Sequence, residues 1–269
     1  MRRTLAIALF SLLMTTPGVR AQLGSALAQP VPFPVAKVPF GIGEQMTYRV
    51  DWGFLSVGQG RLEILPALDS MRGVPTYHIG FTMKGGLPLY RVDDYSQSWL
   101  TVSDLISLRF DQNLDEGSYE RHRIVDFFPE EGRWDRLDHE EEGELPSADP
   151  LDDISFLYFV RTLPLEVGET YTFNRYWKDE GNPVTVKVLR KETVKVPAGE
   201  FETIVVRPII KTRGMFSEGG EAEVYFTDDS RRLIVKLNAR MNVGTLKMAL
   251  QSYSPGIQLF STAPPGNTP

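Results

Sequence analysis

The stretch Met46-Thr47-Tyr48-Arg49-Val50-Asp51-Trp52 places apolar and polar side chains at alternating positions. Successive side chains of a β-strand point to opposite faces of a sheet, so this pattern predicts a strand with one buried and one solvated face. The run from Tyr77 to Lys84 repeats the pattern, because Tyr77, Ile79, Phe81 and Met83 alternate with smaller or polar residues. Both runs are typical of half-buried antiparallel strands.

Similar runs fill most of the chain between residues 40 and 254. They cover 61–64, 94–100, 106–112, 119–128, 171–177, 184–189, 203–210, 222–227, 233–241 and 245–253. Turn-forming pairs such as Arg72-Gly73 and Glu116-Gly117 separate them. About a dozen short strands joined by tight turns predict a mainly β protein. We expect a single domain over residues 40–254, built as a strongly curved antiparallel sheet or as an incomplete barrel.

One segment departs from the strand pattern. Asp152 and Asp153 precede an apolar run over residues 154–163, and Pro164 ends it. Acidic residues favour the positive N-terminus of a helix, and proline cannot continue one. Apolar side chains surround this helix almost completely, so it must be buried. The sequence therefore predicts a helix over 153–162 on the concave face of the sheet. The residues predicted to be buried are Phe156, Leu157, Phe159 and Val160.

Two segments of the chain share a short pattern. Gly43-Glu44 and Gly168-Glu169 are each followed by a threonine, an aromatic residue and then a tryptophan, Trp52 in one case and Trp177 in the other. This match indicates two similar halves, 40–150 and 165–254, joined by the helical segment. The alternative is a chance match between two strands that both follow a turn glycine.

The first residues indicate export. Arg2 and Arg3 precede an apolar run over residues 5–13, and Ala21 lies at the position before a cleavage site. This is the three-part pattern of a signal peptide, and the apolar run is shorter than a membrane-spanning helix requires. We expect residues 1–21 to be a cleaved signal peptide. The mature chain is then exported to the periplasm or, as the alternative, secreted.

The segments on either side of the β domain have their own composition. Pro30, Pro32, Pro34 and Pro39 recur too often for a helix or a central strand, which predicts a proline-rich linker over 22–39. The tail 255–269 is predicted to be disordered. No run after residue 21 is long and apolar enough to span a bilayer, so we expect no transmembrane segment in the mature chain.

Composition excludes several classes of function. The chain has no cysteine, which excludes disulfides, thiol catalysis, thiolate metal sites and the lipid-modified cysteine of a bacterial lipoprotein. The net charge is −6, and removal of the three arginines in residues 1–21 makes the mature chain more negative. A negative chain disfavours nucleic acid as a partner.

Four groups of residues resemble one known family. They are Phe40-Gly41-Ile42-Gly43-Glu44 with Tyr48 and Gly58-x-Gly60, the run 153–161, the run 196–203 and the run 225–233. In this order the chain is similar, over most of residues 40–253, to a bacterial family known as domain of unknown function 3108. The resemblance implies an exported envelope protein and supplies no activity. Half-barrel envelope lipid carriers, which wrap a sheet around a helix, are similar in architecture only.

The sequence contains no recognisable catalytic or metal-binding motif. The acidic run 135–142 and the three histidines lack the spacing of a calcium loop or a zinc site, so we interpret the run as a solvated loop. Asp93-Asp94 and Asp228-Asp229 are pairs of adjacent acids, which point to opposite faces in a strand and are common in turns. No nucleophile motif or phosphate-binding loop is present. We therefore assign no catalytic residue, metal or cofactor.

Two loops carry apolar side chains where turns are usually polar. Leu87, Leu89 and Tyr90 follow Gly85-Gly86, and Met215 and Phe216 lie in a second loop of the same kind. Together with Phe156 and Phe159 of the helix, these are the candidate residues for binding an apolar ligand. The alternative is that both loops fold back onto the core.

Three functions are consistent with these patterns. The first is non-catalytic binding or carriage of a lipid or other apolar molecule in the curved sheet. The second is structural, with a sheet edge or the convex face binding another envelope protein. The third is a hydrolase of envelope polymers, whose catalytic residues would have to be scattered along the chain. The oligomeric state is left open.

Overall fold

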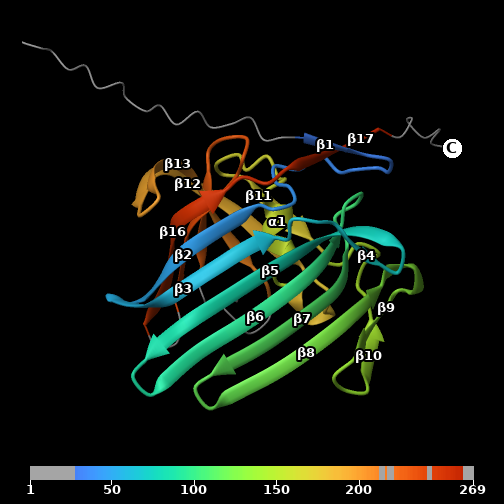
Figure 1. Ribbon diagram of the computed structural model, residues 1–269, viewed down its shortest axis with the longest axis horizontal. Helices are drawn as coiled ribbons and strands as arrows, with labels where there is room; N and C mark the ends of the chain where they lie inside the picture. Colours follow the sequence, from blue (N-terminus) through green and yellow to red (C-terminus); the bar gives the residue numbers. More distant parts are fainter. Residues whose placement is uncertain (1–27, 212–215, 217–220, 241–243, 263–269) are drawn as a thin grey trace, which may run out of the picture.

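One large antiparallel sheet dominates the molecule (Figure 1). The computed structural model describes residues 28–211, 216, 221–240 and 244–262, so the predicted signal peptide and Met215 lie outside the described residues. Within them, fifteen strands form the sheet, in the order β10-β9-β8-β7-β6-β5-β3-β2-β16-β15-β14-β13-β12-β11, with β4 beside β5. β10 and β11 are the two ends of this order, so the sheet is curved but not closed. The mainly β, curved antiparallel fold predicted from the sequence is confirmed.

The strands form two consecutive meanders that meet where β2 pairs with β16. Strands of the first meander are β2 Gln45–Trp52, β3 Leu55–Ile64, β4 Asp69–Met71, β5 Val74–Leu87, β6 Tyr90–Thr101, β7 Ser107–Glu116, β8 Tyr119–Phe128, β9 Arg133–Arg136 and β10 Glu141–Glu144. Strands of the second are β11 Thr170–Phe173, β12 Val184–Val196, β13 Gly199–Ile209, β14 Glu223–Thr227, β15 Ile234–Arg240 and β16 Thr245–Ser254. Short 3-10 helices lie at Pro129–Glu131 and Asp179–Gly181.

Alternating side chains explain why the sheet has an apolar inner face. In β2, Met46, Tyr48 and Val50 are buried, whereas Arg49 on the opposite face is exposed. Its neighbours β3 and β16 bury Leu62, Ile64, Met248 and Leu250 in the same way. The period of two read from the sequence therefore corresponds to the inner and outer faces of the curved sheet.

The α-helix of the described residues, α1 (Ser155–Val160), lies inside this curve, as predicted. It is shorter than the predicted 153–162. Before it, the Asp152 carboxylate accepts hydrogen bonds from the backbone amides of Ile154 and Ser155. After it, the chain turns more tightly, with hydrogen bonds from Arg161 N to Tyr158 O and from Thr162 N to Phe159 O. Phe156 and Val160 are buried. Leu157 and Phe159 are only half-buried, so the expectation of four buried residues holds for two of them.

Two short segments near the ends of the described chain pair with each other, within the ranges predicted as a linker and as a disordered tail. β1 (Ala28–Val31) pairs in parallel with β17 (Gln258–Ser261), and Val31 is buried. Figure 1 shows this pair across the end of the molecule away from the hairpin tips at lower left. The proline spacing did not reveal the pairing, because prolines are compatible with a two-stranded edge sheet.

The acidic run interpreted as a solvated loop contributes instead to two strands. β9 and β10 pair antiparallel, with Trp134 buried beneath Gly143. Arg136 binds Asp138 and Glu141, so this neighbouring arginine offsets part of the negative charge.

The segments that share the Gly-Glu pattern occupy different places, since β2 is central and β11 is the last strand of the sheet.

Candidate ligand-binding cavities

The concave face encloses a cavity of about 600 Å³ beside the helix, called the main cavity below. One of its walls is apolar. It is formed by residues of β3, β5, β15, β16 and α1: Leu62, Phe81, Met83, Leu157, Leu237 and Met248. These positions face inward because they share the phase of the buried residues on their strands. Phe216 also lines this cavity.

The opposite wall of the main cavity is polar and centres on Arg123 of β8. The Arg123 side chain is buried, and its Nη2 donates to Gln112 Oε1 at 3.2 Å and to Asp153 Oδ2 at 3.3 Å. Its guanidinium lies 5.0 Å from the ring centre of Phe110 and 5.4 Å from that of Trp177. Arg123 Nε has no hydrogen-bond partner among the described residues. A buried cation with unused hydrogen-bonding capacity is costly unless something else pairs with it.

Tyr176 and Asp153 complete this polar group. The Tyr176 hydroxyl donates to Asp153 Oδ1 at 2.9 Å, so Asp153 bridges Tyr176 and Arg123. Burial, together with the negative charge of Asp153, raises the pKa of Tyr176 well above its usual value. The hydroxyl is therefore a neutral hydrogen-bond donor at physiological pH. Lys178 lines the same wall, with its Nζ 4.7 Å from the ring centre of Trp177.

A second cavity of about 440 Å³, the outer cavity, continues along the concave face toward the hairpin tips. It shares Met83 and Glu116 with the main cavity. The other lining residues are largely apolar: Val50, Trp52, Val57, Leu87, Tyr90, Val92 and Leu246. The shared residues place the two cavities next to each other, which gives a long apolar surface with the Arg123 group on the wall of the inner part.

Glycines bring two strands close together along the outer cavity. Gly58 of β3 pairs with Gly85 of β5, and both line the outer cavity. A Cβ on Gly85 would overlap the carbonyl oxygen of Val57, and one on Gly58 would overlap that of Lys84. Only glycine permits this approach.

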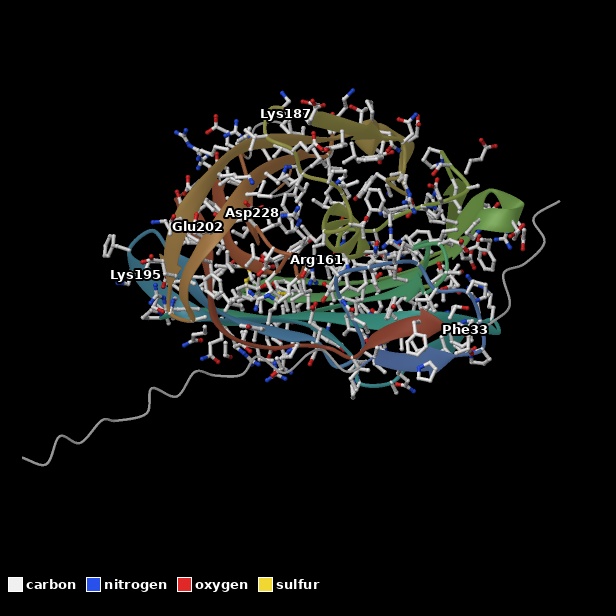
Figure 2. All side chains as sticks on the ribbon, turned by 90° about the horizontal axis from the view of Figure 1, so that it is seen from above. Phe33, Arg161, Lys187, Lys195, Glu202 and Asp228 are labelled. Atoms are coloured by element: carbon white, nitrogen blue, oxygen red, sulfur yellow. The ribbon has the colours of Figure 1, made fainter. Side chains whose placement is uncertain are left out.

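A buried ion pair holds the helical segment in place. Arg161, immediately after α1, donates from Nη1 and Nη2 to the two carboxylate oxygens of Glu44 at 2.5 and 2.9 Å, and Nη2 also donates to the backbone oxygen of Arg231. Both side chains are almost completely buried. Figure 2 shows Arg161 in the interior, whereas Lys187 and Lys195 lie on the outside of the sheet.

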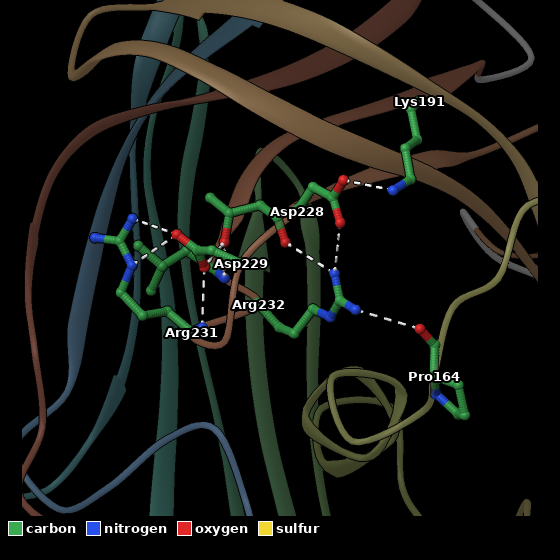
Figure 3. Close-up of polar contacts among 8 residues, drawn as sticks. Pro164, Lys191, Asp228, Asp229, Arg231 and Arg232 are labelled. Atoms are coloured by element: carbon green, nitrogen blue, oxygen red, sulfur yellow. Dashed lines mark hydrogen bonds and ion pairs between the residues drawn. The ribbon is translucent and has the colours of Figure 1, made fainter.

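The turn between β14 and β15 reinforces this attachment (Figure 3). Asp228 binds Lys191 at 2.6 Å, and Asp229 accepts from Arg231 Nε at 2.9 Å. Arg232 Nη2 donates to the backbone oxygen of Pro164, beyond the end of α1. Hydrogen bonds from these cations lower the pKa of both Asp228 and Asp229. The two acids therefore stabilise a turn, in agreement with their interpretation from the sequence.

The residues proposed from the sequence lie in three different settings. Leu87 and Tyr90 line the outer cavity, and Phe216 lines the main cavity. Leu89 is fully exposed and lines neither cavity. Met215 lies outside the described residues.

The two helix phenylalanines line neither cavity. Phe156 is buried in the core, and Phe159 packs edge-on against Phe173 at 5.0 Å between ring centres. Leu157 is the α1 residue whose side chain lines the cavity. An all-apolar helix gives no sequence signal for which side faces a cavity rather than packed side chains. Strand alternation places Phe81 and Met83 on the inner face, but it does not distinguish a cavity wall from a filled core.

No group of three or more histidine and acidic side chains in the described part of the chain is arranged to hold a metal ion. Among the described residues, no helix is long and apolar enough to cross a membrane.

Comparisons with known proteins bear on the fold and the family. The model of the family described as "Protein of unknown function (DUF3108)" matches residues 47–251. A crystal structure of a β-barrel-like protein of the domain of unknown function DUF1849, from Brucella abortus, is similar with a TM-score of 0.50 and 8% identity. The similarity covers 81% of this chain and 99% of that one, and it concerns the fold alone.

More distant structural similarities involve a candidate lipoprotein from Parabacteroides distasonis and a candidate exported protein with a YmcC-like fold from Bacteroides fragilis. The first has a TM-score of 0.37 and 8% identity, with 82% of this chain and 100% of that chain covered. The second has a TM-score of 0.35 and 12% identity, with 82% and 99% covered. No curated protein matches the sequence.

Proposed function

This chain belongs to the DUF3108 family of proteins of unknown function, and we propose that it is an exported, non-catalytic protein that binds a lipid or another molecule with a long apolar chain. The observation that carries the proposal is the pair of adjoining cavities on the concave face, of about 600 and 440 Å³. Ligand sites are typically concave, about 300–1,000 Å³ in volume, and mostly apolar with a few polar groups. The predicted signal peptide supports export.

The distribution of polar groups favours an amphipathic ligand. An apolar chain would lie along Phe81, Met83 and Leu237, where burial from water drives binding. A polar head group would lie near Arg123, whose Nε has no hydrogen-bond partner in the described part of the chain. A small movement of the guanidinium would give the head group a charge-assisted hydrogen bond.

The two other functions have weaker support. Strand addition by a partner protein needs an accessible sheet edge, and the end strands β10 and β11 are only four residues long each. For a hydrolase, the acidic pair Asp228 and Asp229 that the sequence offered is held in ion pairs at a turn.

Filling the main cavity tests the proposal. Leu157→Trp places an indole in the cavity, so we expect the affinity for a fluorescent fatty-acid probe to fall at least about tenfold because the chain loses its space. Met83→Gln, which puts an amide between the two cavities, should weaken binding independently if the tryptophan variant folds poorly. Fluorescence titration measures the affinity, and circular dichroism with thermal unfolding checks the fold.

Leu89→Ser is the matched control, because Leu89 lines neither cavity and its loss should leave the probe affinity unchanged. If folded Leu157→Trp and Met83→Gln bind the probe as tightly as the unaltered protein, the concave face is not the binding site. If the unaltered protein binds no apolar probe, the proposed function is wrong.

A further inference from the structure

Three hairpin turns, whose tips lie at the same end of their strands, surround the mouth of the outer cavity. Consecutive strand pairings join Val50 to Gly58, Gly58 to Gly85, Gly85 to Val92, Val92 to Glu116 and Glu116 to Tyr119. This row crosses β2, β3, β5, β6, β7 and β8. The β2–β3, β5–β6 and β7–β8 turns therefore all lie on the same side of the row, at one end of these strands. Figure 1 shows the three tips side by side at lower left.

These tips expose large apolar side chains, which we call the apolar rim: Phe54, Leu55, Leu87, Leu89, Tyr90 and Tyr119. Phe54 is 94% exposed and Leu89 is fully exposed. Half of the large apolar side chains that are exposed in the described part of the chain belong to this rim. Scattered exposed leucines are ordinary, but a cluster on adjacent turns indicates a binding surface.

The backbone keeps Leu89 at the tip despite an unfavourable conformation. Its φ is +72°, in the left-handed region that glycine and asparagine adopt far more readily than leucine. Turns of this kind usually carry polar residues or glycine. Neither packing nor a cavity contact accounts for a leucine here, since the side chain is fully exposed. Strain combined with exposure is typical of a functional position.

Contacts between neighbouring tips make the rim a defined surface. The Tyr90 ring of the β5–β6 turn lies against Gly117 of the β7–β8 turn, where an added Cβ would be 2.8 Å from the ring. Tyr90 and Leu87 also line the outer cavity, so the exposed rim continues directly into its apolar wall.

The charges behind two of the tips are paired. Arg49 binds Asp51 at 3.1 Å, and Asp93 binds both Lys84 at 3.1 Å and Arg91 at 2.5 Å. The β2–β3 and β5–β6 stems therefore present both signs of charge at the level below the apolar tips. Such an arrangement suits the zwitterionic head groups of neutral phospholipids better than a polyanion or a strongly anionic surface.

We propose that the apolar rim docks on a phospholipid membrane, with its tips among the head groups and upper acyl chains. Exposed aromatic and leucine side chains enter this region readily, and ion pairs behind them remain at the level of the head groups. In this position the outer cavity opens onto the lipid, so an apolar chain can enter without crossing water. The reason for docking rests on the proposed function, whereas the docking itself rests on the rim.

Flotation with phosphatidylcholine vesicles tests the docking. We expect the exported protein to float with the vesicles. Phe54→Ser and Leu89→Ser should each lower the partition coefficient about tenfold or more, because each removes a large apolar contact with lipid. Leu137→Ser is the control, since Leu137 is another exposed leucine, 54% exposed and away from the rim, and it should bind as the unaltered protein does. Raising the salt concentration should not release the protein, since apolar contacts with lipid hold the rim.

Two results would overturn this inference. One is the absence of binding to phosphatidylcholine vesicles. If the protein instead forms a dimer that Leu89→Ser dissociates and does not bind vesicles, the rim is a protein interface and the inference is wrong. The other is binding that Leu137→Ser weakens as much as Leu89→Ser. Leu157→Trp separates the two proposals, because it should weaken probe binding in solution and leave vesicle flotation unchanged. Vesicle binding without probe binding would retain the docking and reject the proposed function.

Discussion

Asp94 of β6 lies inside the main cavity, beside Glu116, which lines both cavities. Its side chain is buried, and one carboxylate oxygen accepts the backbone amide of Asp115 at 3.0 Å. Burial, with a smaller contribution from the charge of Glu116, raises the pKa of Asp94 to about 7. The cavity wall therefore changes its charge near neutral pH.

The raised pKa predicts a pH dependence of stability. In the unfolded chain an aspartate has a pKa of about 4, so between about pH 4 and 7 only the folded state holds the proton. The free energy of unfolding should therefore fall as the pH rises from 5 to 8. In Asp94→Asn this contribution should be absent, and urea unfolding at several pH values measures it. Asp93→Asn is the control, because ion pairs lower the pKa of Asp93 and its titration lies below this range. Equal slopes for Asp94→Asn and the unaltered protein would contradict the assignment.

At the same scale, the sequence predicted some of the residues that line the cavities and not others. Leu87, Tyr90 and Phe216 were found because apolar side chains are unusual in turns, and all three line a cavity. The sequence pattern did not indicate Arg123, because an arginine in a strand of alternating residues is normally assigned to the solvated face. Its burial depends on Phe110, Gln112 and Trp177, which only the folded sheet brings together.

At the scale of elements, strand alternation and turn chemistry predicted most of the sheet. The run 119–128 corresponds to β8 without any change of bounds, and β5 and β6 extend the predicted runs by a few residues at their ends. β1 and β17 were missed, because their pairing joins segments from opposite ends of the chain and leaves no local pattern. β9 and β10 were missed because their acidic residues conceal a short hairpin around Trp134.

The close pairing of β3 and β5 makes a prediction about glycine at this scale. Gly85→Ala should destabilise the protein by more than about 1 kcal/mol, because the methyl group meets the backbone of β3, which cannot yield without disturbing the ladder. Gly80→Ala in the same strand is the control. Its added Cβ would lie 3.7 Å from the nearest atoms, an ordinary contact distance. Urea unfolding measures both, and equal stability of the two variants would show that β3 and β5 are less tightly apposed.

At the scale of the whole molecule, the two opposite ends of the central strands are covered differently. The β1–β17 pair lies across one end, and the hairpin tips with the outer cavity lie at the other. Between them, Arg161 and Glu44 fix the helical segment against the concave face, which leaves the two cavities between the helix and the tips. In the described part of the chain, the two adjoining cavities form an apolar surface that runs from the rim toward the Arg123 group.

Native mass spectrometry of the exported protein tests the central claim most directly, namely that the concave face holds a molecule with an apolar chain. The account predicts a species heavier than the chain alone, whose extra mass is removed by organic extraction and identified as an amphipathic molecule. It also predicts that Leu157→Trp, purified in the same way, lacks the extra mass. The account would be contradicted if the unaltered protein carried no such molecule and acquired none after incubation with extracted envelope lipids.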